Sequence, residues 1–169
     1  NENSWVLGPC FDFSEVERPM VSLKIWPQID EGEDGAVLQS SINNGLSWER
    51  VGTLNDGINW YNSFSITGQP GSQTDGWRLD TATSWIEARH ALDQLKGYSK
   101  VRFRIAFGSD GGGARDGFAF DDILIGDRTR NILLEYFTNN NSPSSVSNNL
   151  IINSLASSQA EDVINLQYH

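Results

Sequence analysis

The sequence is poor in cysteine and methionine, with one of each, and it has no long apolar run. Cys10 alone cannot form an intrachain disulfide, and it excludes CxxC redox chemistry and zinc sites built from several cysteines. No segment approaches the roughly 18 apolar residues of a membrane-spanning helix. The start shows no basic segment followed by an apolar run, so no signal peptide is visible and we expect a mature or trimmed chain.

Basic residues are also scarce. The chain has 12 Lys and Arg against 22 Asp and Glu, which gives a formal net charge of −10. A negative field of this size repels phosphate backbones and anionic lipids, so we expect no nucleic acid partner and no membrane insertion. Acidic loops could instead bind Ca²⁺ through carboxylate oxygens, although most acidic side chains serve only as a solvated surface.

The composition changes near residue 130. All Lys and Arg lie in residues 1–130, whereas residues 131–169 have none and contain 15 Asn and Ser among 39 residues. Residues 126–130, Gly-Asp-Arg-Thr-Arg, are typical of a connector. We therefore predict a domain over residues 1–130 and a second segment over 131–169.

The first domain has the pattern of short strands separated by turns rich in Gly, Asn and Asp. In the clearest strand, Val101, Phe103, Ile105 and Phe107 alternate with polar or small residues and should face one way. Residues 84–97 fit either a helix, with Ser84 and Glu87 as a capping box, or a strand followed by a helical turn, which we favour. The expected strands are residues 21–26, 36–41, 48–51, 59–66, 84–91, 100–107 and 117–125. This series predicts a mainly β fold, an antiparallel jelly-roll β-sandwich.

The tail has a different pattern. Residues 132–137 are a nearly continuous apolar run, as in a buried parallel strand. A helix over about 144–158 and a second strand over 163–168 would complete a short C-terminal βαβ segment. Such a unit is too small to fold stably alone.

Residues 41–48, Ser-Ile-Asn-Asn-Gly-Leu-Ser-Trp, match the Asp-box hairpin with Asn43 at the Asp position. The side chain of Asn43 should bond backbone N–H groups of the turn, Gly45 should supply a positive φ, and Trp48 should pack beneath. The motif predicts a folded hairpin and says little about function.

Asp121 and Asp122 are adjacent acids inside an apolar strand, so one of them should point inward or to a sheet edge. A buried carboxylate needs a cation or a hydrogen-bonding partner. Asp34 and either Glu31 or Glu33 in the acidic turn are the candidate partners for a structural Ca²⁺ site. The alternatives are an ion pair with a strand arginine, Arg102 or Arg104, and hydrogen bonds that cap loop N–H groups.

Four aromatic residues, Trp60, Tyr61, Trp77 and Trp85, could form a platform on which sugar rings stack. Packing in the core is the commoner role of such residues. His90, the only internal histidine, should be a packed and hydrogen-bonded residue rather than a catalytic one, because no nucleophile or oxyanion hole accompanies it.

Six segments together resemble the jelly-roll superfamily that includes MAM domains, reelin repeats and accessory modules of secreted bacterial proteins. They are residues 9–14, 18–23, 33–40, the Asp-box hairpin, 101–107 and 117–123. The resemblance covers about residues 5–127 and implies a non-catalytic adhesion or glycan-binding module, with a cation near Asp121 and, less directly, Asp34 and Glu31. Members carry one or two strands before the position of Pro9, so we expect an incomplete, N-terminally truncated sheet.

The tail, residues 131–169, resembles the opening βαβ of thioredoxin-like domains of secreted bacterial proteins. In those domains the loop after the first strand carries CxxC. Here that loop, residues 139–145, contains no cysteine, so the resemblance implies a partial domain without thiol redox function.

The leading hypothesis is a secreted or cell-surface β-sandwich module that binds a glycan or a surface protein, is stabilised by Ca²⁺ and catalyses no reaction. A second hypothesis is a polysaccharide hydrolase whose acidic cleft includes Asp121 and Glu31, since glycosidases use two facing carboxylates. A third is an inert scaffold derived from a thioredoxin-like domain.

Overall fold

The structure is a computed structural model that describes residues 2–28, 34–78, 83–112, 116–128 and 148–154 and the backbone of residues 132–137 and 163–168. The chain divides into two compact units, Asn1–Asp127 and Arg128–His169. Each unit is described by itself.

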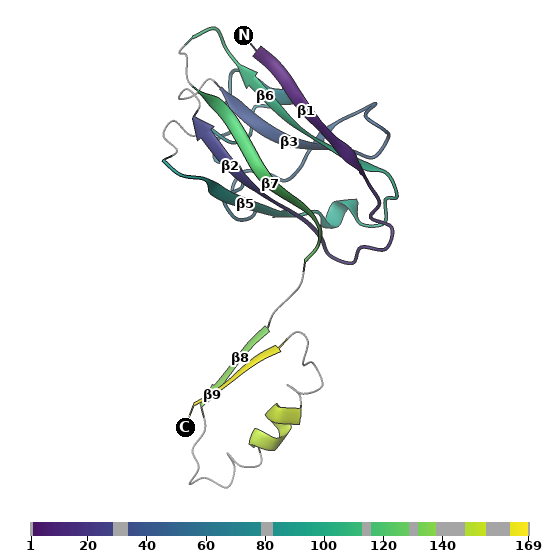
Figure 1. Cartoon of the computed structure of the whole chain (residues 1–169), viewed down its shortest axis with the longest axis vertical. Helices are drawn as coiled ribbons and strands as arrows, with labels where there is room; N and C mark the ends of the chain where they lie inside the picture. The colour runs from purple at the N-terminus through teal and green to yellow at the C-terminus, as the bar shows by residue number, and fades with distance from the viewer. Residues whose placement is uncertain are drawn as a thin grey trace. The chain divides into compact units, whose positions relative to one another are not determined.

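The first unit is an antiparallel β-sandwich, so the predicted mainly β class is confirmed (Figure 1). One sheet has the strand order β1-β6-β3-β4 and the other has the order β5-β2-β7. The strands are β1 (Glu2–Phe11), β2 (Pro19–Gln28), β3 (Gly35–Ser41), β4 (Glu49–Arg50), β5 (Ile86–Ala91), β6 (Val101–Ser109) and β7 (Gly117–Asp127). Two short 3-10 helices, η1 (Pro70–Ser72) and η2 (Asp93–Leu95), lie in the connections.

The core lies between the two sheets and follows the alternation predicted from the sequence. In β6, Val101, Phe103 and Ile105 are buried, and Phe107 is partly buried against the same core. In β2, alternate positions from Val21 to Ile25 are at most 1% exposed. Burial of these side chains, each worth about 1.5–3 kcal/mol, holds the two sheets together.

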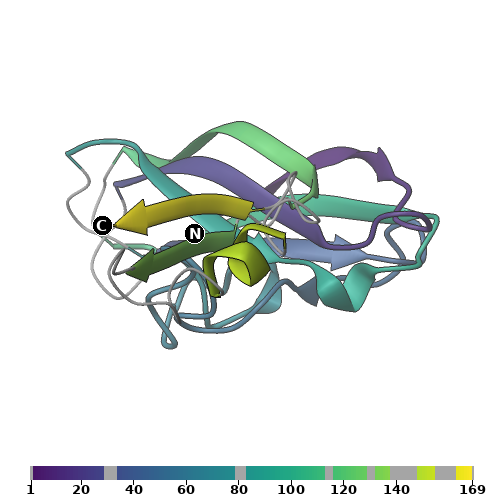
Figure 2. The ribbon, with the colours of Figure 1, turned by 90° about the horizontal axis from the view of Figure 1, so that it is seen from below.

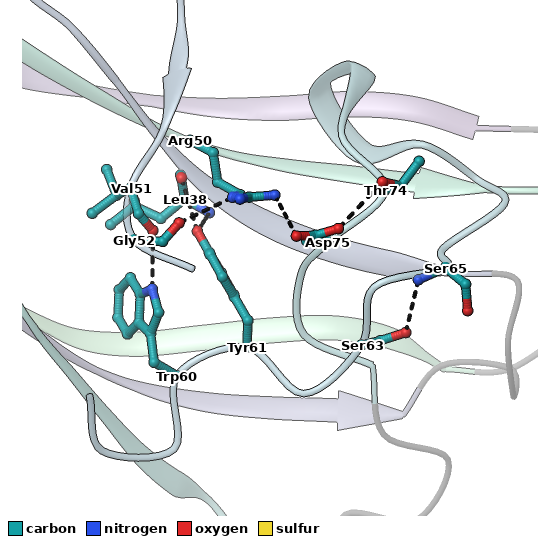
Figure 3. A network of polar contacts seen from close by, with 10 residues as sticks. All are labelled: Leu38, Arg50, Val51, Gly52, Trp60, Tyr61, Ser63, Ser65, Thr74 and Asp75. Carbon is teal, nitrogen blue, oxygen red and sulfur yellow. Dashed lines mark hydrogen bonds and ion pairs between the residues drawn. The ribbon is translucent and has the colours of Figure 1, made fainter. Parts of the chain in front are cut away.

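The strand predicted at residues 59–66 is wrong. This part of the chain forms one isolated bridge, Ser63 to Gly76, and a second bridge, Ile58 to Arg89, lies just before it. It runs along the edge of β3 and is fixed there by side-chain hydrogen bonds: the Tyr61 hydroxyl bonds the backbone of Leu38 (Figure 3). Alternation in a short window cannot separate such a packed loop from a strand.

The Asp-box hairpin between β3 and β4 is confirmed. Asn43 Oδ1 accepts hydrogen bonds from the Ser47 N–H and the Ser41 hydroxyl, both at 2.9 Å. Gly45 has φ +88° and lies against the indole of Trp48. The hairpin therefore presents Trp48 at a fixed place beside the sheet.

Residues 84–97 form a strand and then a 3-10 turn, β5 and η2, as favoured from the sequence over a helix. A strand does lie before Pro9, where the sequence predicted strands that are missing or truncated, because β1 pairs with β6 from Glu2 onward. The pairing shifts register between Leu7 and Cys10, so that the strand continues past Gly8 and Pro9. A turn-like dipeptide thus lies inside a strand.

The second unit contains β8 (Ile132–Phe137), a helix over residues 148–154 and β9 (Val163–Tyr168). The two strands pair in parallel, with Ile132 opposite Val163, and Figure 2 shows them side by side. This order is the predicted short C-terminal βαβ segment. The loop at 139–145 lies outside the described residues.

Candidate functional site

The predicted sugar-stacking platform is not on the surface. Trp60, Tyr61 and Trp77 are at most 2% exposed and pack against one another, with ring centroids 4.8–5.2 Å apart. They fill the sandwich where β3 faces β5, and the ring of Trp60 also lies 4.8 Å from that of His90. The core interpretation therefore holds for these three. Of the four predicted platform residues only Trp85 is exposed, and its ring packs edge-on against the indole of Trp26.

The polar atoms of these aromatic residues all bond to backbone, as Figure 3 shows in part. Trp60 Nε1 donates to the Val51 carbonyl at 2.9 Å. The Tyr61 hydroxyl accepts from the Leu38 N–H at 3.1 Å and donates to the Leu38 carbonyl at 3.0 Å. Complete burial raises the pKa of Tyr61 far above its ordinary value of 10, because the interior disfavours the phenolate. These groups serve the fold.

The structure places the predicted metal ligands in different parts of the sandwich. Asp34 is buried immediately before β3, and its Oδ1 accepts the backbone N–H of Asp110 at 3.1 Å. Asp121 and Asp122 lie within β7 in the other sheet. Glu31 and Glu33 lie outside the described residues. Among the residues that the structure describes, no three His, Cys, Asp or Glu side chains gather as metal ligands, and calcium binding stays a prediction.

The acids of β7 form a bulge. Asp122 has φ +49°, and its N–H donates to Asp121 Oδ1 at 2.8 Å. Its carboxylate pairs with Lys24 at 2.6 Å rather than with a strand arginine. This hydrogen-bonded ion pair raises the pKa of Lys24, and both groups are largely exposed. Exposed pairs of this kind contribute little to stability.

A different group of residues forms a built site on the outer face of the β1-β6-β3 sheet. Arg104 projects there, because it alternates with the buried Phe103 and Ile105. Its guanidinium carbon lies 4.5 Å from the ring centroid of Trp48 and 5.2 Å from that of Trp5. Three distant segments of the chain thus stack a cation between two indoles, and each contact is worth about 0.5–1 kcal/mol at an exposed position.

The guanidinium is held in one orientation. Arg104 Nε donates to Gln39 Oε1 at 2.8 Å, and the buried Gln39 donates in turn to the Gly71 carbonyl at 3.0 Å. Within the described residues, Nη1 and Nη2 of Arg104 have no hydrogen-bond acceptor. Partial burial lowers the pKa of Arg104, yet a guanidinium stays charged at neutral pH.

The surroundings are open and apolar. Trp5 is 57% exposed, and Leu7 on the same strand is opposite Arg104 and 49% exposed. Trp48 is half-buried at the other side of the guanidinium. Exposed indoles with a fixed arginine are typical of recognition surfaces, because they offer large contact area and directed donors with little loss of entropy.

The sequence pattern did not single out Trp5, Trp48 or Arg104 as a site. Trp48 was expected beneath the hairpin, and Arg104 only as an ion-pair partner of an acid. The polar positions of residues 101–107 define the outer face of that strand, and this pattern could have indicated that Arg104 lies on the surface of the sheet. The strand order that brings Trp5 beside it could not be derived from local pattern.

No family model matches the chain, and a search of the curated proteins found no related sequence. The described helix is too short to cross a membrane, and the described residues contain no candidate membrane-spanning helix. The fold and the site therefore define a β-sandwich with a Trp-Arg-Trp surface, and the function is argued from this surface.

Proposed function

We propose that the first unit is a non-catalytic, extracellular binding module and that the stack of Trp5, Arg104 and Trp48 recognises a sugar. The observation that carries the proposal is the guanidinium of Arg104 against two indoles, with its Nε bonded to Gln39 and its Nη groups bonded to no acceptor among the described residues.

The chemistry of this surface suits a carbohydrate. Pyranose rings have an apolar face of C–H groups that packs on an indole, and a rim of hydroxyl oxygens that accept hydrogen bonds. Trp5 offers the more exposed ring, and Arg104 supplies up to four N–H donors beside it. Because the donors are held by Gln39, little conformational entropy is lost on binding.

A glycan array followed by calorimetric titration of the best neutral oligosaccharide tests the proposal. Trp5→Ala and Trp48→Ala should each weaken binding about tenfold or more, as for other central aromatic anchors. Trp85→Ala is the matched control, since Trp85 is 45% exposed immediately before β5 of the other sheet and its loss should leave affinity unchanged.

Two results would count against the proposal. Equal affinity of the Trp5→Ala and Trp85→Ala proteins would place the sugar elsewhere. Release of new reducing ends from the bound polysaccharide would indicate the hydrolase alternative, which Asp121→Asn should then abolish.

The jelly-roll relationship and the extracellular setting belong to the same proposal. The two antiparallel sheets support the resemblance to MAM-like modules. Calcium binding is a separate part, tested by melting the protein in Ca²⁺ and in EDTA. A melting temperature that rises with Ca²⁺ in the wild type and not in Asp34→Asn would support it.

A further inference from the structure

One side of the sandwich is open. β1 is the last strand of one sheet and β7 the last strand of the other (Figure 1). Residues of both strands line the same groove. The groove holds two cavities of about 220 and 300 Å³, and Val6, Ile105 and Phe120 line both of them. The two cavities are therefore neighbours along the strands. The opposite side is filled by the buried aromatic cluster of Trp60, Tyr61 and Trp77.

Apolar side chains at this groove remain in water. Val6 is 58% exposed and Ile123 is 48% exposed, although both line the space between the sheets. Phe118 and Phe120 are only partly buried against the core. An extended apolar groove between two sheet edges is unlike scattered surface residues, and such continuous patches mark interaction sites.

The two edges of the groove differ. β7 is interrupted by the bulge at Asp121 and Asp122, with Lys24 paired to it, and charges and bulges of this kind protect an edge from further pairing. β1 pairs with β6 in regular register from Glu2 to Leu7. Its outer edge carries no proline, lysine or bulge over these residues, so it is a template for one more strand.

The charge of the groove indicates which side chains an added strand should have. Glu2 and Asp116 line the groove at the end where β1 begins and β7 begins. A second copy of the chain would bring another formal charge of −10 to this surface. The groove instead favours a peptide with a positively charged residue beside Glu2 and Asp116 and with apolar residues farther along the groove.

We propose that an extended peptide adds to the outer edge of β1 at Glu2–Leu7 as an antiparallel strand. Its alternate side chains are apolar and enter the groove above Ile105 and Phe120, and its basic residue lies beside Glu2 and Asp116. This site is distinct from the Trp-Arg-Trp surface, because successive residues of β1 face opposite sides of the sheet.

The test uses the full chain and a capped hexapeptide, acetyl-Thr-Val-Thr-Val-Thr-Lys-amide, whose Val, Val and Lys would face Val6, Ser4 and Glu2 in antiparallel register. Binding is measured by fluorescence anisotropy of the labelled peptide. Val6→Lys should weaken binding at least about tenfold, since it puts a charge in the apolar groove. Leu124→Lys is the matched control, equally exposed at 58% but outside the cavity lining, and should have no effect.

Two further arms separate the parts of the proposal. Replacing the peptide's Lys by Glu should weaken binding, and N-methylation of the peptide backbone should abolish it, because strand addition needs its amides. Failure of the unmodified peptide to bind at about 1 mM would overturn the proposal, as would equal affinity of Val6→Lys and wild type. A dimer by light scattering that Val6→Lys dissociates would show a second copy in the groove and would also overturn it.

Discussion

Tyr61→Phe is the substitution whose cost follows most directly from the structure. The side chain is fully buried, and its hydroxyl is bonded both to the N–H and to the carbonyl of Leu38. Phenylalanine keeps the ring and its packing but leaves the Leu38 N–H without this acceptor, whereas the Leu38 carbonyl still accepts the N–H of Val51 at 3.0 Å. One unsatisfied buried group costs about 1–3 kcal/mol, so we expect a loss of that size in the free energy of unfolding.

Urea unfolding followed by tryptophan fluorescence measures this loss. All six tryptophans lie within the first unit, so the signal reports that unit alone. The midpoint should fall while the slope with urea stays unchanged, since the surface exposed on unfolding is the same. Tyr98→Phe is the control, because Tyr98 is 43% exposed and should tolerate the change.

The pH dependence gives a second readout of the same group. Burial raises the pKa of Tyr61 in the folded state, so its stabilising effect is complete below pH 10 and is lost as the pH rises above it. Above about pH 10, wild type should lose about 1.4 kcal/mol per pH unit more than Tyr61→Phe does. A Tyr61→Phe cost below about 0.5 kcal/mol would refute the reasoning, because such a value means that the Leu38 N–H does not depend on this hydroxyl.

Three other substitutions test the fold. A Cβ at Gly108 would overlap the carbonyl oxygen of Gly68, so Gly108→Ala should lower the melting temperature by several degrees, whereas Gly126→Ala, with open space around it, should not. Asn43→Ala removes three side-chain hydrogen bonds of the hairpin and should cost about 1–2 kcal/mol in urea unfolding; an unchanged midpoint would contradict the role given to this side chain. Lys24→Met breaks only an exposed ion pair, so the melting temperature at pH 7 should stay the same. A changed melting temperature would contradict the small contribution expected of this pair.

The sheets that the sequence predicted well are those whose strands alternate. From Val101 to Phe107 the apolar positions define one face, and burial of that face fixes the strand. The Asp-box hairpin was also predictable, because its hydrogen bonds join residues within one turn. Local pattern suffices where the stabilising contacts are local.

β1 could not be predicted on the same grounds. Trp5, Val6 and Leu7 are consecutive apolar residues without alternation, and Gly8 and Pro9 follow them like a turn. The strand exists because β6 supplies a partner a hundred residues later and a register shift accommodates the dipeptide. At residues 59–66 the opposite error occurs. The sequence alternates like a strand, but tertiary hydrogen bonds hold the segment as a packed loop.

The candidate site was missed for a related reason. Arg104 and Trp48 were each noted as single residues, but their meeting with Trp5 depends on the strand order β1-β6-β3. Conversely, Trp60, Tyr61 and Trp77 have the composition of a platform, and only burial shows that they are core. Residue type indicates chemistry, while position in the sheet decides whether that chemistry reaches solvent.

The pairing of β1 with β6 has a consequence for how the chain is made. The N–H of Glu2 finds its acceptor on Ser109, 107 residues further along. At about 5–20 residues per second, the ribosome needs roughly 5–20 s to deliver that partner. Throughout this interval the segment with Trp5, Val6 and Leu7 has no sheet to join. Nascent chains should therefore depend on a chaperone or on slow, late docking of β1, as expected for folds dominated by distant contacts.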